Sequence, residues 1–163
     1  MKYFELEPAD ISNLNDADLR EMVARLCEAE LIQQKIQPSC VLWGGAQEAP
    51  DGGLDVRIKD SPTFRTPSFV PRENTGFQVK KNSMGKTACT NEMLEKGSVK
   101  PIITDLALKN GAYIIVSGKD DCSDKMLSER LNGMRVAIKD LGNKDDLLLD
   151  FYGRDRLSTW LRQ

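Results

Sequence analysis

The spacing of hydrophobic residues predicts a series of helices. The first begins at Asn15 or Asp16, either of which can cap it, and its apolar positions recur at helical spacing from Leu19 to Leu26. The same spacing predicts helices over residues 86–96, 101–110, 123–141 and 155–162, the longest of them capped by Ser123. Residues 1–13 carry weak signals and are interpreted as a lead-in without an element of its own.

Short runs of β-branched and aromatic residues predict the strands. They cover residues 41–43, the stretch around Asp55, and residues 76–81, 112–116 and 147–152. The run 112–116 is apolar without interruption, which is typical of a central strand covered on both faces. Because helices and strands alternate, the fold class expected is α/β, a mixed central sheet flanked by helices in a sandwich. With 163 residues, of which 40% are hydrophobic, we expect a single domain over residues 1–163.

Polar residues stand in two of these strands at positions that can share a face. In an extended chain alternate residues point the same way, so Gln78 and Lys80 share a face and Val79 points away. If this strand pairs with the one at Asp55, a carboxylate, an amide oxygen and an ammonium group converge beside a Gly-rich turn. Together these groups could hold a hard divalent cation and a phosphate.

The first helix carries an acid on its apolar face. Continuing that face by one turn brings up Glu30, whereas Glu21 and Glu28 fall nearly opposite. A buried carboxylate is costly unless it has a partner, such as a cation or a metal ion. Two interpretations stay open: Glu30 belongs to a metal site, or the helix ends there and the side chain reaches solvent.

Charge is distributed unevenly along the chain. The net charge of −2 argues against a protein that coats nucleic acid over its whole surface. Residues 57–86 nevertheless hold seven Lys and Arg against two acids, which indicates a local anionic ligand or, equally, a solvated basic loop. The long loop 59–76 contains Phe64 and Phe69, which could contact a nucleic acid or, in the favoured interpretation, anchor the loop to the core.

The residue types that the chain lacks exclude several kinds of catalytic site and metal site. The chain has no histidine, which excludes histidine-based acid–base catalysis, catalytic triads and the usual mixed zinc sites. Its four cysteines are scattered without a Cys-x-x-Cys pair, as expected of reduced thiols. No signal peptide opens the sequence and no apolar run is long enough to span a bilayer, so we expect a soluble cytoplasmic protein without membrane contact.

The order of the polar residues resembles a known enzyme family. A helix, a Gly-Gly-Leu-Asp strand start ending at Asp55, the Gln78-Val79-Lys80 element, a helix and an apolar strand follow one another. This series resembles the PD-(D/E)XK nuclease superfamily and is most similar to its Mrr-like branch, where the acid-x-Lys element is often Gln-x-Lys. The resemblance runs from the first helix to the end of the chain and implies a restriction-endonuclease-like α/β/α sandwich.

The resemblance implies a role for each residue of the motif. Asp55 would be the central metal ligand, Gln78 would add a neutral oxygen, and the carbonyl of Val79 would complete the protein ligands of Mg²⁺ (or Mn²⁺). Lys80 would orient the attacking water or stabilise charge on the phosphate. The activity implied is endonucleolytic hydrolysis of DNA, most simply double-stranded, with one or two metal ions. The basic segment would supply the contacts to DNA phosphates: Arg57, Lys59, Lys81 and Lys86.

Two positions depart from the family pattern. Gln78 replaces an acid and removes a negative charge, so another carboxylate is needed at the metal, and Glu30 is the first choice on the helical-face argument. The family often places its helix acid nearer the start of the helix, where this chain has Arg20. The remaining candidates for the acid are Glu28, Glu21 and the turn residue Asp51.

Domains similar to this one occur as amino-terminal effectors of larger bacterial anti-phage defence proteins. In these proteins an ATPase and sensor region clusters the nuclease domains, so the resemblance implies a homo-oligomer when active. The absence of a helix stop signal before Gln163 fits a piece of a longer protein. Two other functions stay open: a catalytically weak module that binds nucleic acid or a protein partner, favoured by Gln78, and a purely structural α/β domain. The substrate is open between double-stranded DNA, single-stranded DNA and RNA.

Overall fold

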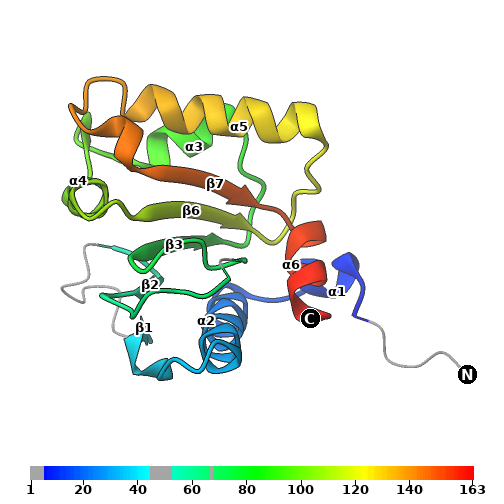
Figure 1. Ribbon diagram of the computed structural model, residues 1–163. Helices are drawn as coiled ribbons and strands as arrows, with labels where there is room; N and C mark the ends of the chain where they lie inside the picture. Colours follow the sequence, from blue (N-terminus) through cyan, green and yellow to red (C-terminus); the bar gives the residue numbers. More distant parts are fainter. Residues whose placement is uncertain (1–5, 45–52, 67) are drawn as a thin grey trace, which may run out of the picture.

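A mixed five-stranded sheet forms the centre of the molecule (Figure 1). The computed structural model describes residues 6–44, 53–66 and 68–163. Across the sheet the strands are β1 (Val41–Trp43), β2 (Val56–Ile58), β3 (Thr75–Lys80), β6 (Ala112–Ser117) and β7 (Leu148–Tyr152), while β4 (Leu94–Glu95) and β5 (Ser98–Val99) form a separate hairpin. The helices are α1 (Pro8–Ser12), α2 (Asp16–Gln33), α3 (Lys86–Glu92), α4 (Pro101–Leu108), α5 (Asp124–Ala137) and α6 (Arg154–Leu161), with 3₁₀ turns at Pro38–Cys40 and Lys144–Asp146.

The sheet changes from antiparallel to parallel at β3. β1, β2 and β3 are antiparallel neighbours, whereas β6 runs parallel to β3 and β7 parallel to β6. Phe77 stands between Val56 of β2 and Ile114 of β6, so β3 is paired along both edges. The crossover from β3 to β6 passes through α3 and α4, because a parallel connection needs a long return path.

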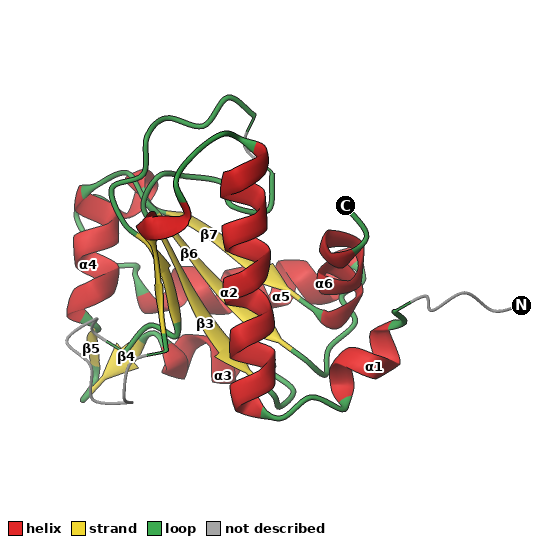
Figure 2. Cartoon of the chain, turned by 90° about the horizontal axis from the view of Figure 1, so that it is seen from below, coloured by secondary structure: helices red, strands yellow, loops and turns green. Residues whose placement is uncertain are grey.

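Helices cover both faces of the sheet. α2 and α6 pack on one face, against side chains such as Val56, Phe77 and Ile114, and Figure 2 shows α2 crossing in front of the strands. α3, α4 and α5 pack on the other face, against Tyr113 and Ile115 among others. Successive residues of β6 thus enter opposite cores, which explains why this strand is apolar throughout. The expected α/β fold, a mixed sheet flanked by helices, is confirmed.

The predicted helices are present, but their ends differ. Asn15 caps α2 and Ser123 caps α5, each through a side-chain oxygen that accepts a backbone N–H. α3 ends at Glu92 instead of residue 96, because the chain turns into the β4–β5 hairpin through Lys96 and Gly97, both at positive φ. Residues 8–12 form α1, which the sequence analysis does not predict. Within the described residues, no helix has both the length and the apolar character needed to cross a membrane.

A glycine brings α3 and α5 into backbone contact. A β-carbon on Gly133 of α5 would overlap the carbonyl oxygen of Lys86 in α3. We expect Gly133→Ala to lower the free energy of unfolding by about 1–3 kcal/mol, the usual effect of overpacking. Urea unfolding measures the change, with Gly142→Ala as the control, because a β-carbon there meets nothing within 4 Å. Equal stability of the two variants would contradict a tight contact between these helices.

Candidate active site

Asp55 connects the adjoining ends of β2 and β3. It directly precedes β2, and its Oδ2 accepts hydrogen bonds from the backbone N–H of Val79 (2.8 Å) and from Nε2 of Gln78 (2.9 Å). The backbone N–H of Asp55 in turn donates to the carbonyl of Phe77 (3.1 Å). The structure therefore brings Asp55 and Gln78 together.

Alternate residues of β3 point to opposite faces of the sheet. Val79 is buried in the core beneath α2. Lys80 points to the α3 side, where its Nζ lies 3.2 Å from Oε1 of Glu92. The Lys80 side chain is 35% exposed, so its ammonium group reaches both Glu92 and solvent.

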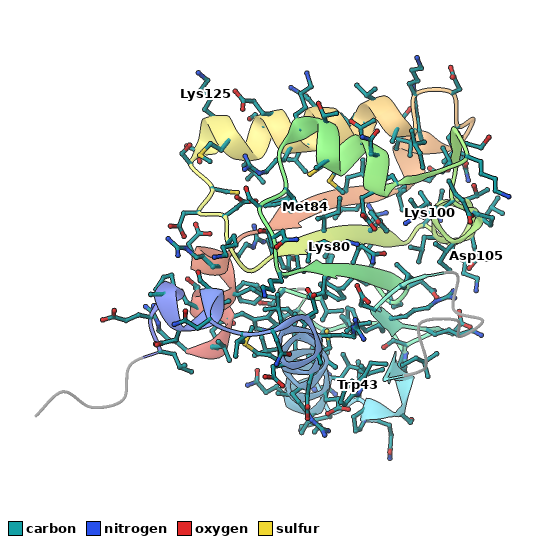
Figure 3. All side chains as sticks on the ribbon, turned by 180° about the vertical axis from the view of Figure 1, so that it is seen from behind. Trp43, Lys80, Met84, Lys100, Asp105 and Lys125 are labelled. Atoms are coloured by element: carbon teal, nitrogen blue, oxygen red, sulfur yellow. The ribbon has the colours of Figure 1, made fainter. Side chains whose placement is uncertain are left out.

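Glu92 links Lys80 to a second lysine. Its Oε1 also lies 3.3 Å from Nζ of Lys100, the residue before α4 (Figure 3). The Glu92 side chain is only 18% exposed, so water screens these two ion pairs weakly. Glu92 and Lys100 could not be identified from the sequence, because the packing of α3 and α4 brings them to β3 and no local pattern marks that approach.

Arg20 of α2 places a cation at Asp55. Its Nε lies 3.0 Å from Oδ1 of Asp55, and both side chains are mostly buried. Arg20 occupies the position at which the family that the sequence resembles often has an acid. The aspartate therefore has a guanidinium group on one oxygen and two N–H donors on the other.

Burial and charge act in opposite directions on the Asp55 carboxyl. Burial raises its pKa, and the negative charge of Glu92 adds to that effect. A backbone hydrogen bond and the charges of Arg20 and Lys80 favour the ionised form. Burial raises the pKa of the Tyr113 hydroxyl, and the charges of Glu92 and Asp55 raise it further. Asp55 and Glu92 thus act within one electrostatic site.

Glu30 lies apart from this site. Its Oε1 accepts a hydrogen bond from the backbone N–H of Val70 (3.0 Å), in the loop before β3. At a rise of 1.5 Å per residue, Glu30 lies about 15 Å along α2 from Arg20, which contacts Asp55. The prediction that Glu30 joins the metal site is therefore corrected. Its side chain does not reach solvent either, since it is only 6% exposed.

The buried carboxyl of Glu30 should make stability depend on pH. Burial raises the pKa of Glu30, and hydrogen bonds from the 68–70 loop oppose this only in part. A carboxyl with a raised folded-state pKa contributes stability at acid pH that is lost as the pH rises through that pKa. As the pH rises from about 4 to about 8, we therefore expect the free energy of unfolding of Glu30→Gln to increase relative to that of wild type. Urea unfolding across this range measures the difference, and a constant difference would contradict the effect.

The two other candidate acids of α2 take part in a surface network. Glu21 and Glu28 both pair with Arg25, and Oε1 of Glu28 accepts a hydrogen bond from Nε1 of Trp43 (3.3 Å). This network ties α2 to β1 and does not include Asp55. The remaining candidate acid, Asp51, lies outside the described residues.

The basic residues predicted to contact DNA do not form one surface. Arg57 is buried, with Nη2 2.8 Å from Oδ2 of Asp105 in α4, so the prediction that it binds phosphates is corrected. Lys59 follows β2 beside the start of β3, whereas Lys81 follows the end of β3, about 20 Å away at 3.3 Å per residue. Lys81 and Lys86 are exposed: Lys81 directly follows the end of β3 at which Asp55 lies, and Lys86 begins α3.

The phenylalanines of the loop before β3 are anchors. Phe64 and Phe69 are 7% and 8% exposed. Phe69 stacks on Trp160 of α6, with ring centroids 5.1 Å apart. Since buried rings cannot stack on bases, the interpretation of these residues as contacts to nucleic acid is corrected, and the anchor interpretation is confirmed.

The oxygen atoms at Asp55 match the ligands that Mg²⁺ prefers. These are the Asp55 carboxylate, the Val79 carbonyl and the Gln78 amide oxygen, which a half-turn of the amide presents in place of its nitrogen. Mg²⁺ and Mn²⁺ bind few protein oxygens and complete their shells with water. Across residues 6–44, 53–66 and 68–163, no three Asp, Glu or Cys side chains gather into a metal-binding group, so a bound ion would rely on these mixed donors.

The charges of the site are nearly balanced. Two carboxylates, Asp55 and Glu92, contact three cationic side chains, those of Arg20, Lys80 and Lys100. The arrangement can bind a phosphate through its cations and a divalent ion through its oxygens. Comparisons with protein families, with curated proteins and with solved structures found no match to this chain.

Proposed function

We propose that this domain is a metal-dependent endonuclease that hydrolyses phosphodiester bonds of DNA. The observation that carries the proposal is the contact of Asp55 with Gln78 and with the amide of Val79. Lys80, two residues later in the same strand, points to the α3 side. Because alternate residues of a strand share a face, Gln78 points to this side as well. A carboxylate, an amide and an ammonium group on adjoining strands are a suitable set for metal-assisted hydrolysis.

Some residues of the site would bind the metal ion, and others would bind the phosphate. Asp55, Gln78 and the carbonyl of Val79 would hold a Mg²⁺ or Mn²⁺ ion, which polarises a phosphoryl group and lowers the pKa of a bound water. Lys80 would donate to a phosphate oxygen and stabilise charge that develops in the transition state. Lys81 and Lys86, which are both exposed, would bind neighbouring phosphates.

Glu92 would position Lys80. Because Lys100 shares the same carboxylate oxygen, Glu92 stays neutralised when Lys80 turns to a phosphate. A role in anti-phage defence, as a cytoplasmic oligomer fused to an ATPase and sensor region, rests on the sequence resemblance.

Cleavage of plasmid DNA tests the proposal. Wild-type protein is incubated with Mg²⁺ or Mn²⁺, with EDTA as the blank, both alone and fused to a dimerising domain. We expect metal-dependent nicking or linearisation of the plasmid. Parallel reactions with single-stranded DNA and RNA identify the preferred substrate. No cleavage of any substrate in either form would overturn the proposal.

A catalytically weak binding module is the second candidate. The observation that favours it is the ion pair between Arg20 and Asp55, which neutralises the carboxylate that a metal ion needs. Such a module would retain DNA, with an affinity that falls steeply with salt, and would leave it intact. Binding without cleavage in the plasmid experiment would support this candidate over the first.

A further inference from the structure

The guanidinium group of Arg20 is held at Asp55 by charge and not by a directed hydrogen bond. Nε lies 3.0 Å from Oδ1 of Asp55, yet its N–H finds no hydrogen-bond acceptor among the described residues. Arg154 provides a contrast, because it donates two hydrogen bonds to Asp121, of 2.9 and 2.6 Å. A buried donor without an acceptor is unfavourable, so Arg20 gains a partner when an anion enters the site.

The two terminal nitrogens of Arg20, Nη1 and Nη2, are also available to bind a ligand. Within the described part of the chain, neither Nη1 nor Nη2 donates a hydrogen bond to the protein, while a quarter of the side chain (25%) is exposed. A guanidinium group presents its N–H donors in a planar fork that matches a phosphate. Arg20 therefore reaches the solvent side of Asp55 with donors suited to a phosphate.

The two oxygens of Asp55 face different partners. Oδ1 faces the Arg20 guanidinium, whereas Oδ2 faces the Val79 amide and the Gln78 side chain. A two-metal site needs carboxylate oxygens directed at two ions about 3.5–4 Å apart. Here the oxygen that would serve a second ion already faces a cation, and the site holds more cationic than anionic side chains.

We propose that Arg20 takes the place of a second metal ion, so that the site binds one divalent ion and Arg20 binds an oxygen of the same phosphate. This inference rests on the proposed function and assigns its metal stoichiometry. The phosphate of the substrate would contact the guanidinium group, and the Arg20–Asp55 ion pair would loosen as the phosphate binds. Arg20 thereby supplies positive charge where other sites use a metal ion.

Binding of Mn²⁺ tests the inference without depending on catalysis. Calorimetry and electron paramagnetic resonance count the ions bound per chain in wild type, Asp55→Asn, Arg20→Ala and Arg20→Gln. We expect one Mn²⁺ that is lost in Asp55→Asn. Both Arg20 variants should bind Mn²⁺ about tenfold more tightly, because a competing positive charge is gone, while DNA cleavage falls by about 10²-fold or more. Arg20→Gln retains most of the length of the side chain, so it provides a folded variant if Arg20→Ala does not fold.

Arg25→Ala is the matched control. Arg25 lies on the same helix but pairs with Glu21 and Glu28, so this variant should keep both Mn²⁺ affinity and cleavage. Two Asp55-dependent ions per wild-type chain would overturn the inference and leave the proposed function standing. So would Arg20 variants with unchanged Mn²⁺ affinity and cleavage. Mn²⁺ binding that survives Asp55→Asn would overturn the proposed function and the inference together.

Discussion

Replacing Asp55 with asparagine is expected to lower metal-dependent DNA cleavage by about 10³-fold or more, because the proposed metal site would lose its central ligand and, with the ion, several kcal/mol of transition-state stabilisation. Asp55 is the carboxylate that contacts both Gln78 and Val79. Asparagine has nearly the same shape and can still accept a hydrogen bond from the Val79 amide, so the strand ends should stay together. The loss would then reflect charge and not folding.

Three measurements separate these effects for Asp55→Asn. Initial rates of plasmid cleavage at saturating Mn²⁺ give the catalytic effect, Mn²⁺ titration gives the affinity for the ion, and thermal unfolding checks the fold. Asp140→Asn is the control, because Asp140 is exposed in the turn that follows α5. Cleavage within tenfold of wild type would show that Asp55 does not hold an essential ion.

Lys80→Ala should have the second largest effect, a fall of about 10²–10³-fold in the cleavage rate with DNA affinity nearly unchanged. The ammonium group would act on charge that is present only in the transition state, so its removal lowers the rate more than it weakens binding. Lys80 is partly exposed beside Glu92, whereas Lys125 lies on the outer side of α5 (Figure 3).

Lys125→Ala serves as the charge-matched control for Lys80→Ala. Both variants remove one lysine, so any general effect of net charge on DNA binding appears in both. Single-turnover cleavage at saturating DNA gives the rate, and salt-dependent binding gives the affinity. If Lys80→Ala weakens DNA binding as much as it slows cleavage, Lys80 contributes uniform binding and has no special role in the chemical step.

The sheet could be predicted from the sequence because its signals are local. The apolar run 112–116 marks β6, and alternation places Gln78 and Lys80 on one face of β3 whatever packs around them. The end of α3 could not be predicted in this way. Residues such as Met93 suit a helix as well as a hairpin, and the turn at Lys96 decides between them only in the folded chain.

The residues that contact Asp55 and Lys80 could not be predicted from the sequence in this way. Helical periodicity identifies the buried face of α2, and Glu30 is indeed buried, but periodicity does not say which segment covers each turn of the helix. The contact between Arg20 and Asp55 depends on the angle at which α2 crosses the sheet. The meeting of Glu92 with Lys80 and Lys100 depends on where α3 and α4 dock. These are tertiary relations without a local sequence signal.

The pairing of β3 along both edges determines where the chain can tolerate insertions. A single residue added within β3 would turn every later side chain of the strand to the opposite face, so Lys80 would enter the α2 core and Val79 would leave it. Residues added to the preceding loop leave this alternation intact, and lengthening a surface loop changes its closure entropy only slightly. Length variation in this domain should therefore concentrate before β3, while the spacing from Phe77 to Lys80 stays fixed.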